Sequence, residues 1–399
     1  MTEAVRSRNR TLCNALRVIL PTEAETELLR AILYSGDEGQ NAWHDWRRRI
    51  GDPIEAFRDT HREQKGLIPL LHVATVRNEV ELDSRVGGFL RAAYFREQLR
   101  GNAYRRILRE TLTAIAADGP APVVMRGCAL SDTVYDVPEA RHSHGINLLL
   151  QDADADRAVA ALLSQGFQPV RGRDGSRASR FPLSWTHAQG LPLELHTQLL
   201  DIPRYAAPMS EVWSRVRPLP QWEPVARMLA FEDALIQVAG NAAHSAGRNS
   251  LRWACDASLL MARQPGLDWS LVLAIVEATR LALPLSITMR YLAEELGASV
   301  PAEMIAQLDA LADRSDYLAY EIAVLGALGG AHAKMRRKIA TAPDWRARFT
   351  LLRCLLIPSA ASMRATGHAS DSWRLPYHYL RRPIVYAARS AFRLGMRPA

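Results

Sequence analysis

Cysteine pairs, long apolar runs and lysine are all scarce in this 399-residue sequence. The cysteines lie far apart and form neither a CxxC pair nor a metal-ligand spacing: Cys13, Cys128, Cys255 and Cys354. We therefore expect free thiols in a reducing compartment, not a disulfide framework or a cysteine-bound zinc ion. The uncharged apolar run at residues 322–333 is too short to span about 30 Å of hydrocarbon, and the N-terminus has no signal-peptide pattern. These absences predict a cytoplasmic protein without a transmembrane helix.

Positive charge is concentrated at one end of the chain. From Lys334 onward, fourteen basic residues stand against two acidic ones, so residues 334–399 carry a charge of +12 while the rest of the chain sums to −4. Only three lysines occur, so the basic residues are almost all arginine. The overall composition, 48% hydrophobic and 23% charged, excludes a collagen-like, disordered or low-complexity chain. The net charge of +8 therefore belongs to the tail and gives no support for a basic surface over the whole protein.

Hydrophobic periodicity divides the chain into four regions. Residues 1–118 and 222–333 place apolar side chains at i, i+3, i+4 and i+7, which predicts helices. Residues 119–221 contain strand patterns at 122–126, 146–150, 167–171, 184–187 and 191–200, with helices at 128–137 and 152–165. Residues 334–399 form a basic helical tail. The sequence predicts an α+β protein in which a small mixed β-sheet module is flanked by N- and C-terminal helical regions.

Three aspartates at alternate positions, Asp152, Asp154 and Asp156, open the second helix of this module. Aspartate at a helix start caps backbone N–H groups and complements the helix dipole. We interpret this cluster as a helix cap and not as a set of metal ligands.

Polar residues gather at the ends of the predicted strands, where the sites of such folds tend to lie. Arg126-Gly127 ends the first strand, and Arg141 precedes the run His142-Ser143-His144-Gly145-Ile146-Asn147 that enters the second. A later strand carries Glu194-Leu195-His196. Further along, the segment HSAGRNSLRWACDASLL contains His244, Arg252, Trp253 and Asp256.

In this order and spacing, the chain resembles the nucleotidyltransferases with the polymerase-β type fold. It is most similar to the subfamily often encoded in polysaccharide and lasso-peptide gene clusters. In that subfamily a strand ends in Lys-Gly, a helix follows, and an Arg leads into Ser-Asp-Ile-Asp on the next strand. A third acidic residue then lies beside a His on a later strand. The likeness includes the basic C-terminal segment and covers nearly the whole chain.

The resemblance implies transfer of a nucleotidyl group from a nucleoside triphosphate to a peptide, sugar or small-molecule acceptor in a biosynthetic pathway. In such a reaction Mg²⁺ bridges phosphate oxygens, lowers the pKa of the attacking hydroxyl and neutralises the leaving pyrophosphate. By position, the nucleotide-binding residues would be Arg126, Gly127, Arg141, Ser143 and His144. The catalytic, metal-binding positions would be Gly145, Asn147 and Glu194.

The sequence departs from the family pattern at these metal-binding positions. Gly145 and Asn147 stand where the family has two aspartates, so only Asn147 and Glu194 remain as candidate metal ligands. Because hard Mg²⁺ favours anionic oxygen, we expect weak or absent Mg²⁺ binding and little or no ordinary transfer. A natural replacement and an introduced one would give the same pattern. The alternative function is a catalytically inactive pseudo-enzyme that binds a nucleotide or a partner.

Four further residues have two interpretations each. One interpretation is that they line the acceptor side of the cleft, and the other is that they serve a structural role such as an ion pair. The four residues are His196, His244, Arg252 and Asp256. A second metal hypothesis joins His142-x-His144 to Glu194-x-His196, because residues two apart share one face of a strand and imidazole suits zinc or manganese. Trp253, Leu259 and Leu260 follow helical spacing, which predicts core positions.

The basic tail, with its segment RRPIVYAARSAFRLGMR, has three interpretations. It packs near the mouth of the active site, binds an acidic or phosphate-rich partner, or makes peripheral contact with a membrane. The alternation of aromatic and basic residues typical of single-strand binding is missing, which disfavours nucleic acid.

Overall fold

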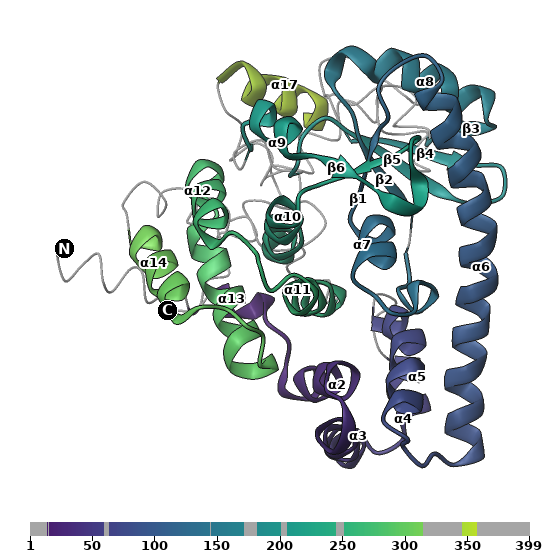
Figure 1. Ribbon diagram of the computed structural model, residues 1–399, viewed down its shortest axis with the longest axis vertical. Helices are drawn as coiled ribbons and strands as arrows, with labels where there is room; N and C mark the ends of the chain where they lie inside the picture. The colour runs from purple at the N-terminus through teal and green to yellow at the C-terminus, as the bar shows by residue number, and fades with distance from the viewer. Residues whose placement is uncertain are drawn as a thin grey trace.

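In the computed structural model the described residues are 14, 16–59, 64–143, 145–170, 182–200, 206–244, 251–313 and 345–356. The N-terminal region consists of helices α2 (Glu23–Leu33), α3 (Gly36–Ile50), α4 (Pro53–Asp59), α5 (Ile68–Arg77) and α6 (Ser84–Ala116). Helix α2 begins with a capping box, in which Thr22 and Glu25 satisfy each other's backbone N–H groups. At about 1.5 Å per residue, α6 is roughly 50 Å long. It runs along one side of the molecule from the N-terminal helices to the sheet (Figure 1).

The described strands form one seven-stranded mixed sheet, in the order β3-β4-β5-β2-β1-β7-β6. The strands are β1 (Val123–Met125), β2 (Ile146–Leu149), β3 (Phe167–Pro169), β4 (Leu183–His187), β5 (Pro192–His196), β6 (Arg217–Pro218) and β7 (Arg227–Met228). Strand β2 lies between β1, to which it is antiparallel, and β5, to which it is parallel. Helices α7 (Gly127–Thr133), α8 (Ala155–Ser164) and α9 (Met209–Arg215) connect the strands.

The two faces of the sheet differ in what they pack against. Val124, Leu148 and Leu193 belong to a buried cluster with the C-terminal half of α6 and with α8. The alternate positions on the central strands, Val123, Met125 and Leu149, belong to a cluster with the C-terminal helices. Because strand side chains alternate between faces, residue 147 of β2 and residues 194 and 196 of β5 lie on this second face.

Helices α10 (Phe231–His244), α11 (Arg252–Arg263), α12 (Trp269–Thr279), α13 (Ala282–Leu296) and α14 (Ala302–Ala312) form the C-terminal helical region. They share one buried cluster with α2, α3 and α5. The Thr26 and Tyr291 hydroxyls lie 2.8 Å apart, and Arg30 forms an ion pair of 2.8 Å with Glu295. The two helical regions of the sequence analysis are therefore packed together around a common core. Beyond them, α17 (Trp345–Leu356) is the described part of the basic tail.

The α+β architecture predicted from the sequence is confirmed. The structure adds β6 and β7, which the strand pattern did not predict, and β7 lies within residues 222–333, which we predicted to be helical. The predicted cap at Asp152, Asp154 and Asp156 also differs in detail. The first two aspartates lie in a 3₁₀ turn ahead of α8, and Asp154 occupies the N-cap position without a side-chain cap. Its carboxylate instead accepts a hydrogen bond of 2.9 Å from Arg157.

Within the described ranges, no helix combines the length and apolarity needed to cross a membrane. Cys128 and Cys255 are free thiols, as expected for these two positions. Cys13 lies outside the described residues.

Candidate functional site

A row of polar side chains crosses the centre of the sheet. Asn147 of β2 is the register partner of Glu194 on parallel strand β5. Glu194 is in turn opposite Ser184 on β4, whose hydroxyl donates a hydrogen bond of 3.2 Å to Glu194 Oε1. Partners in register point to the same face, so this row carries the amide and the carboxylate side by side.

Two nitrogen groups converge on the side-chain oxygen of Asn147. Arg126 Nη1 donates to Asn147 Oδ1 at 3.2 Å, and His196 Nε2 lies 3.0 Å from the same oxygen. The His196 ring is buried, and its Nε2 is also 3.7 Å from Glu194 Oε2. The structure therefore brings Arg126, Asn147, Glu194 and His196 together, and it places His196 beside the predicted metal-binding positions.

Arg126 itself has an unusual backbone conformation. Its φ of 57° and ψ of −137° fall in a region that glycine adopts readily and other residues rarely do. Such a conformation costs about 1–3 kcal/mol and is retained where surrounding contacts require it. Here it turns the chain from β1 into α7 and directs the guanidinium toward Asn147.

Gly127 follows at the start of α7 and allows two side chains to approach closely. A Cβ atom at this position would lie 2.7 Å from both Arg141 Nη1 and Ser143 Oγ. The glycine that the sequence analysis assigned to phosphate binding therefore has a packing role. The helix behind it has seven residues, so its dipole is a small source of attraction for a phosphate.

Gly145 lies just before β2, against the backbone of β5. A Cβ atom added there would lie 2.7 Å from the carbonyl oxygen of Pro192 and 3.1 Å from Pro192 Cβ. Contacts this short with backbone atoms require movement of one of the strands. The first of the expected aspartate positions therefore has no space for a side chain in the present arrangement of β2 and β5.

Arg141 forms a buried ion pair with Asp256. Its guanidinium donates to both carboxylate oxygens of Asp256, at 2.8 and 2.6 Å, and Tyr135 Oη donates to the same carboxylate at 2.6 Å. Burial opposes ionisation of Arg141, but the Asp256 charge outweighs it and raises the pKa of Arg141. Burial, together with the Asp256 charge, raises the pKa of Tyr135 well above its ordinary value. Of the two interpretations of Asp256, the geometry places it in an ion pair, with Arg141 as its partner.

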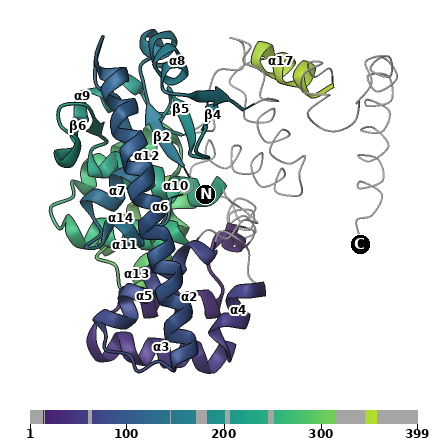
Figure 2. The ribbon, with the colours of Figure 1, turned by 90° about the vertical axis from the view of Figure 1, so that its right-hand side faces the viewer.

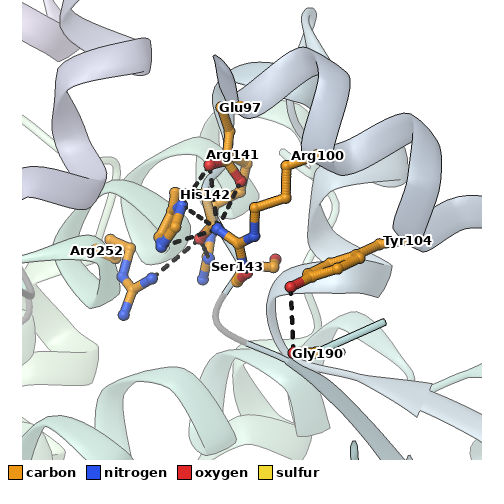
Figure 3. A network of polar contacts seen from close by, with 8 residues as sticks. All are labelled: Glu97, Arg100, Tyr104, Arg141, His142, Ser143, Gly190 and Arg252. Atoms are coloured by element: carbon orange, nitrogen blue, oxygen red, sulfur yellow. Dashed lines mark hydrogen bonds and ion pairs between the residues drawn. The ribbon is translucent and has the colours of Figure 1, made fainter. Parts of the chain in front are cut away.

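The segment that leads into β2 is clamped by arginines from several elements (Figure 3). The carbonyl oxygen of His142 accepts from Arg252 Nη1 at 3.0 Å and also from Arg141, while the carbonyl oxygen of Ser143 accepts from Arg100. The His142 ring lies between Glu97 Oε2, 2.6 Å from Nδ1, and Arg100 Nη1, 2.8 Å from the same nitrogen. This clamp fixes the approach to Gly145. It also holds the His142 ring against Glu97 and Arg100.

A pocket of about 60 Å³ lies on the α6 side of this segment. Its lining includes Glu97, Tyr104, Cys128, Ser143 and Gly145. Burial raises the pKa of the Cys128 thiol to about 11, so this cysteine is a packing residue and not a nucleophile at neutral pH.

The donor set does not fit a magnesium ion. Mg²⁺ in proteins is held by oxygen ligands, mostly carboxylates, in near-octahedral geometry. At the expected positions the chain offers one carboxylate, from Glu194, and the amide oxygen of Asn147. That oxygen already accepts a hydrogen bond from the cationic guanidinium of Arg126. Among the residues that the structure describes, no group of three or more His, Cys, Asp or Glu side chains could hold a metal ion.

The other residues predicted to belong to the site lie partly within and partly outside the described part of the chain. His144 lies outside the described residues, and the structure places only the backbone of His244, which ends α10. Arg252 is buried and contacts the His142 backbone, which is a positioning role. Trp253, Leu259 and Leu260 pack in the core as predicted. The sequence analysis missed Glu97, Arg100 and Tyr135, because the groups they contact around His142 and Asp256 lie far away in the sequence. It also missed Ser184, whose partner Glu194 is on the next strand, because the strand pattern does not mark a single polar residue.

The chain was compared with family models, curated proteins and solved structures. A family model described as an uncharacterised nucleotidyltransferase matches residues 61–297, which is more than half of the chain. No curated protein and no solved structure matches the chain.

Proposed function

The chain belongs to a family of nucleotidyltransferases, and from this premise we propose that it retains the nucleotide-binding part of that function and has lost the Mg²⁺-dependent step. It is then a pseudo-enzyme of the polymerase-β type, related to the subfamily found in polysaccharide and lasso-peptide gene clusters. Its ligand is a nucleoside triphosphate, bound without a metal ion at the polar row of β2 and β5. Gly145 and Asn147 stand at the positions of the missing aspartates.

The contact between Arg126 and Asn147 is the observation that carries this proposal. The guanidinium donates to the Asn147 side-chain oxygen, the atom through which this residue would bind a cation. A guanidinium is always charged and matches phosphate oxygens in a bidentate manner. It can therefore neutralise a phosphate. Unlike Mg²⁺, it does not coordinate an attacking hydroxyl and lower its pKa.

The lack of space for a side chain at Gly145 also supports the loss of the Mg²⁺-dependent step. An aspartate there would overlap the Pro192 backbone. The spacing between β2 and β5 at this point is therefore suited to glycine.

A second candidate is a weakly active transferase for a peptide, sugar or small-molecule acceptor. The observation in its favour is the register of Asn147 and Glu194, which keeps two oxygen ligands adjacent on one face of the sheet. In that case Glu194 and Asn147 would be the metal ligands. The two candidates differ in whether metal is needed and whether pyrophosphate is released.

Titration calorimetry with ATP and GTP, in EDTA and again in Mg²⁺, tests the proposal. We expect binding with a Kd that changes less than about twofold when Mg²⁺ replaces EDTA, and no pyrophosphate release. Arg126→Gly is the informative variant, because glycine suits the backbone φ of 57° while removing the guanidinium. Loss of a charge-assisted hydrogen bond predicts binding weaker by about tenfold to hundredfold.

Arg109→Ala, which removes an arginine that stacks on Trp222, is the matched control and should bind as the unaltered protein does. Pyrophosphate release that requires Mg²⁺ would favour the second candidate. If Arg126→Gly leaves nucleotide binding unchanged, Arg126 does not contact the nucleotide. Lack of heat from either nucleotide, with or without metal, would contradict both candidates.

A further inference from the structure

Helix α17 presents an exposed apolar face to solvent. Trp345, Phe349 and Leu352 are 71%, 64% and 41% exposed, which is unusual for side chains of this size. They follow one another at i, i+4 and i+7, so they lie on one face over about two turns. Figure 2 shows α17 standing apart from the body of helices and sheet.

Arginines flank this apolar face on both sides. At 100° per residue, Arg346 and Arg353 lie on one side of the Trp345–Leu352 stripe and Arg348 lies on the other. All three are exposed, and α17 contains no acidic residue. The Arg346 guanidinium lies 5.5 Å from the centre of the Trp345 ring, so the charge is next to the apolar face.

We propose that α17 is an interfacial helix that lies in the plane of an anionic lipid surface. An apolar face with Trp, Phe and Leu, and with arginines beside it, suits the boundary between acyl chains and headgroups, where the aromatic rings and the guanidinium groups meet different media. The charge is complementary: residues 334–399, of which α17 is the described part, carry +12. A negatively charged leaflet attracts such a segment over about one Debye length.

A lipid surface explains the pattern better than a protein groove does. An amphipathic helix that docks into a groove commonly buries its apolar residues in pockets and pairs its charges with specific partners. In α17 arginines lie on both sides of the Trp345–Leu352 stripe. When the stripe contacts a flat lipid surface, these arginines can contact anionic headgroups on either side of it. The proposal does not depend on the nucleotide site, because it rests on α17 and on the charge of residues 334–399.

Vesicle co-sedimentation with the full chain tests the proposal. The probes are vesicles of phosphatidylcholine and vesicles in which about a third of the lipid is phosphatidylglycerol. We expect binding to the anionic vesicles that falls steeply when NaCl is raised from 0.1 to 0.5 M, and little binding to phosphatidylcholine alone, since salt screens surface charge. Each arginine near the surface contributes roughly a fivefold change in partitioning.

Two variants separate the apolar and charged contributions. Trp345→Ser with Phe349→Ser removes the apolar face, and its matched control is Phe95→Ser at an exposed position on α6. Arg346→Gln, Arg348→Gln and Arg353→Gln together remove the charge. Their control is the same change at Arg48, Arg58 and Arg85, which are exposed on α3, α4 and α6. Both α17 variants should lose at least tenfold in vesicle binding while both controls keep it.

Several results would overturn the proposal. Equal binding to neutral and anionic vesicles, or no binding to either, would contradict it. So would vesicle binding that the α17 variants leave unchanged. If light scattering shows a dimer that the Trp345→Ser and Phe349→Ser variant dissociates, the apolar face is a self-association surface instead.

Discussion

The carbonyl oxygen of Pro192 lies 2.7 Å from the point where Gly145 would carry a Cβ atom. The two strands β2 and β5 therefore approach each other at a distance that only glycine permits at this position. A side chain at position 145 would therefore meet the backbone of β5.

Gly145→Ala should destabilise the protein by about 1–3 kcal/mol, because an extra methyl group must displace backbone and not a flexible side chain. Urea unfolding followed by circular dichroism measures the change. Gly88→Ala is the matched control: Gly88 lies in α6 with open space around it, and alanine there should stabilise by about 0.5–1 kcal/mol. Equal effects of the two changes would show that the β2–β5 approach is not tight.

Asn147→Asp should create a weak metal site without restoring transfer. The new carboxylate would lie beside Glu194 in register, so two anionic ligands would face a divalent cation. Gly145 still supplies none. We expect Mn²⁺ binding, measured by electron paramagnetic resonance, at least tenfold tighter than in the unaltered protein, and still no pyrophosphate release. Asn41→Asp on the exposed surface of α3 adds the same charge in the N-terminal helical region and should leave Mn²⁺ binding unchanged. Pyrophosphate release from Asn147→Asp would contradict our assignment of Gly145 as limiting.

Local patterns were sufficient to predict the sheet module. Alternating apolar residues marked β5, while the family resemblance, and not spacing, placed Asn147 and Glu194 in one site and left Ser184 out. Strands β6 and β7 have two residues each, which is too short for any periodic signal. The contacts of Arg126 with Asn147 and of Gly145 with Pro192 depend on how three strands come together. They could not be predicted from spacing, and they decide how the site is interpreted.

The Arg141–Asp256 pair supports a different prediction. With side chains only 9% and 5% exposed, it joins the segment before β2 to helix α11. Asp256→Asn should cost about 3–5 kcal/mol, because it leaves a buried guanidinium without its charged partner. Glu294→Gln, which breaks an exposed ion pair with Arg290, should change stability by less than about 0.5 kcal/mol. Thermal and urea unfolding of both variants provide the comparison, and similar losses would show that Asp256 is not the anchor of this segment.

Glu97 should make stability depend on pH in the acid range. Burial raises the pKa of its carboxyl, but the hydrogen bond and charge of His142, the Arg100 charge and the Ser143 N–H together outweigh burial and lower it below the ordinary 4.5. A lowered pKa in the folded state means that the ionised carboxylate stabilises the fold above pH 4.5, and that this contribution is lost as the pH falls through the lowered pKa.

The urea midpoint of the unaltered protein should therefore be higher than that of Glu97→Gln at pH 6 to 7. This difference in midpoint should shrink as the pH falls below about 4.5. Glu294→Gln, at an exposed position, controls for removal of a carboxylate and should show little change across the same range. A difference between Glu97→Gln and the unaltered protein that stayed constant down to pH 3 would mean that Glu97 acts through packing. The clamp on His142 and Ser143 would then not depend on its charge.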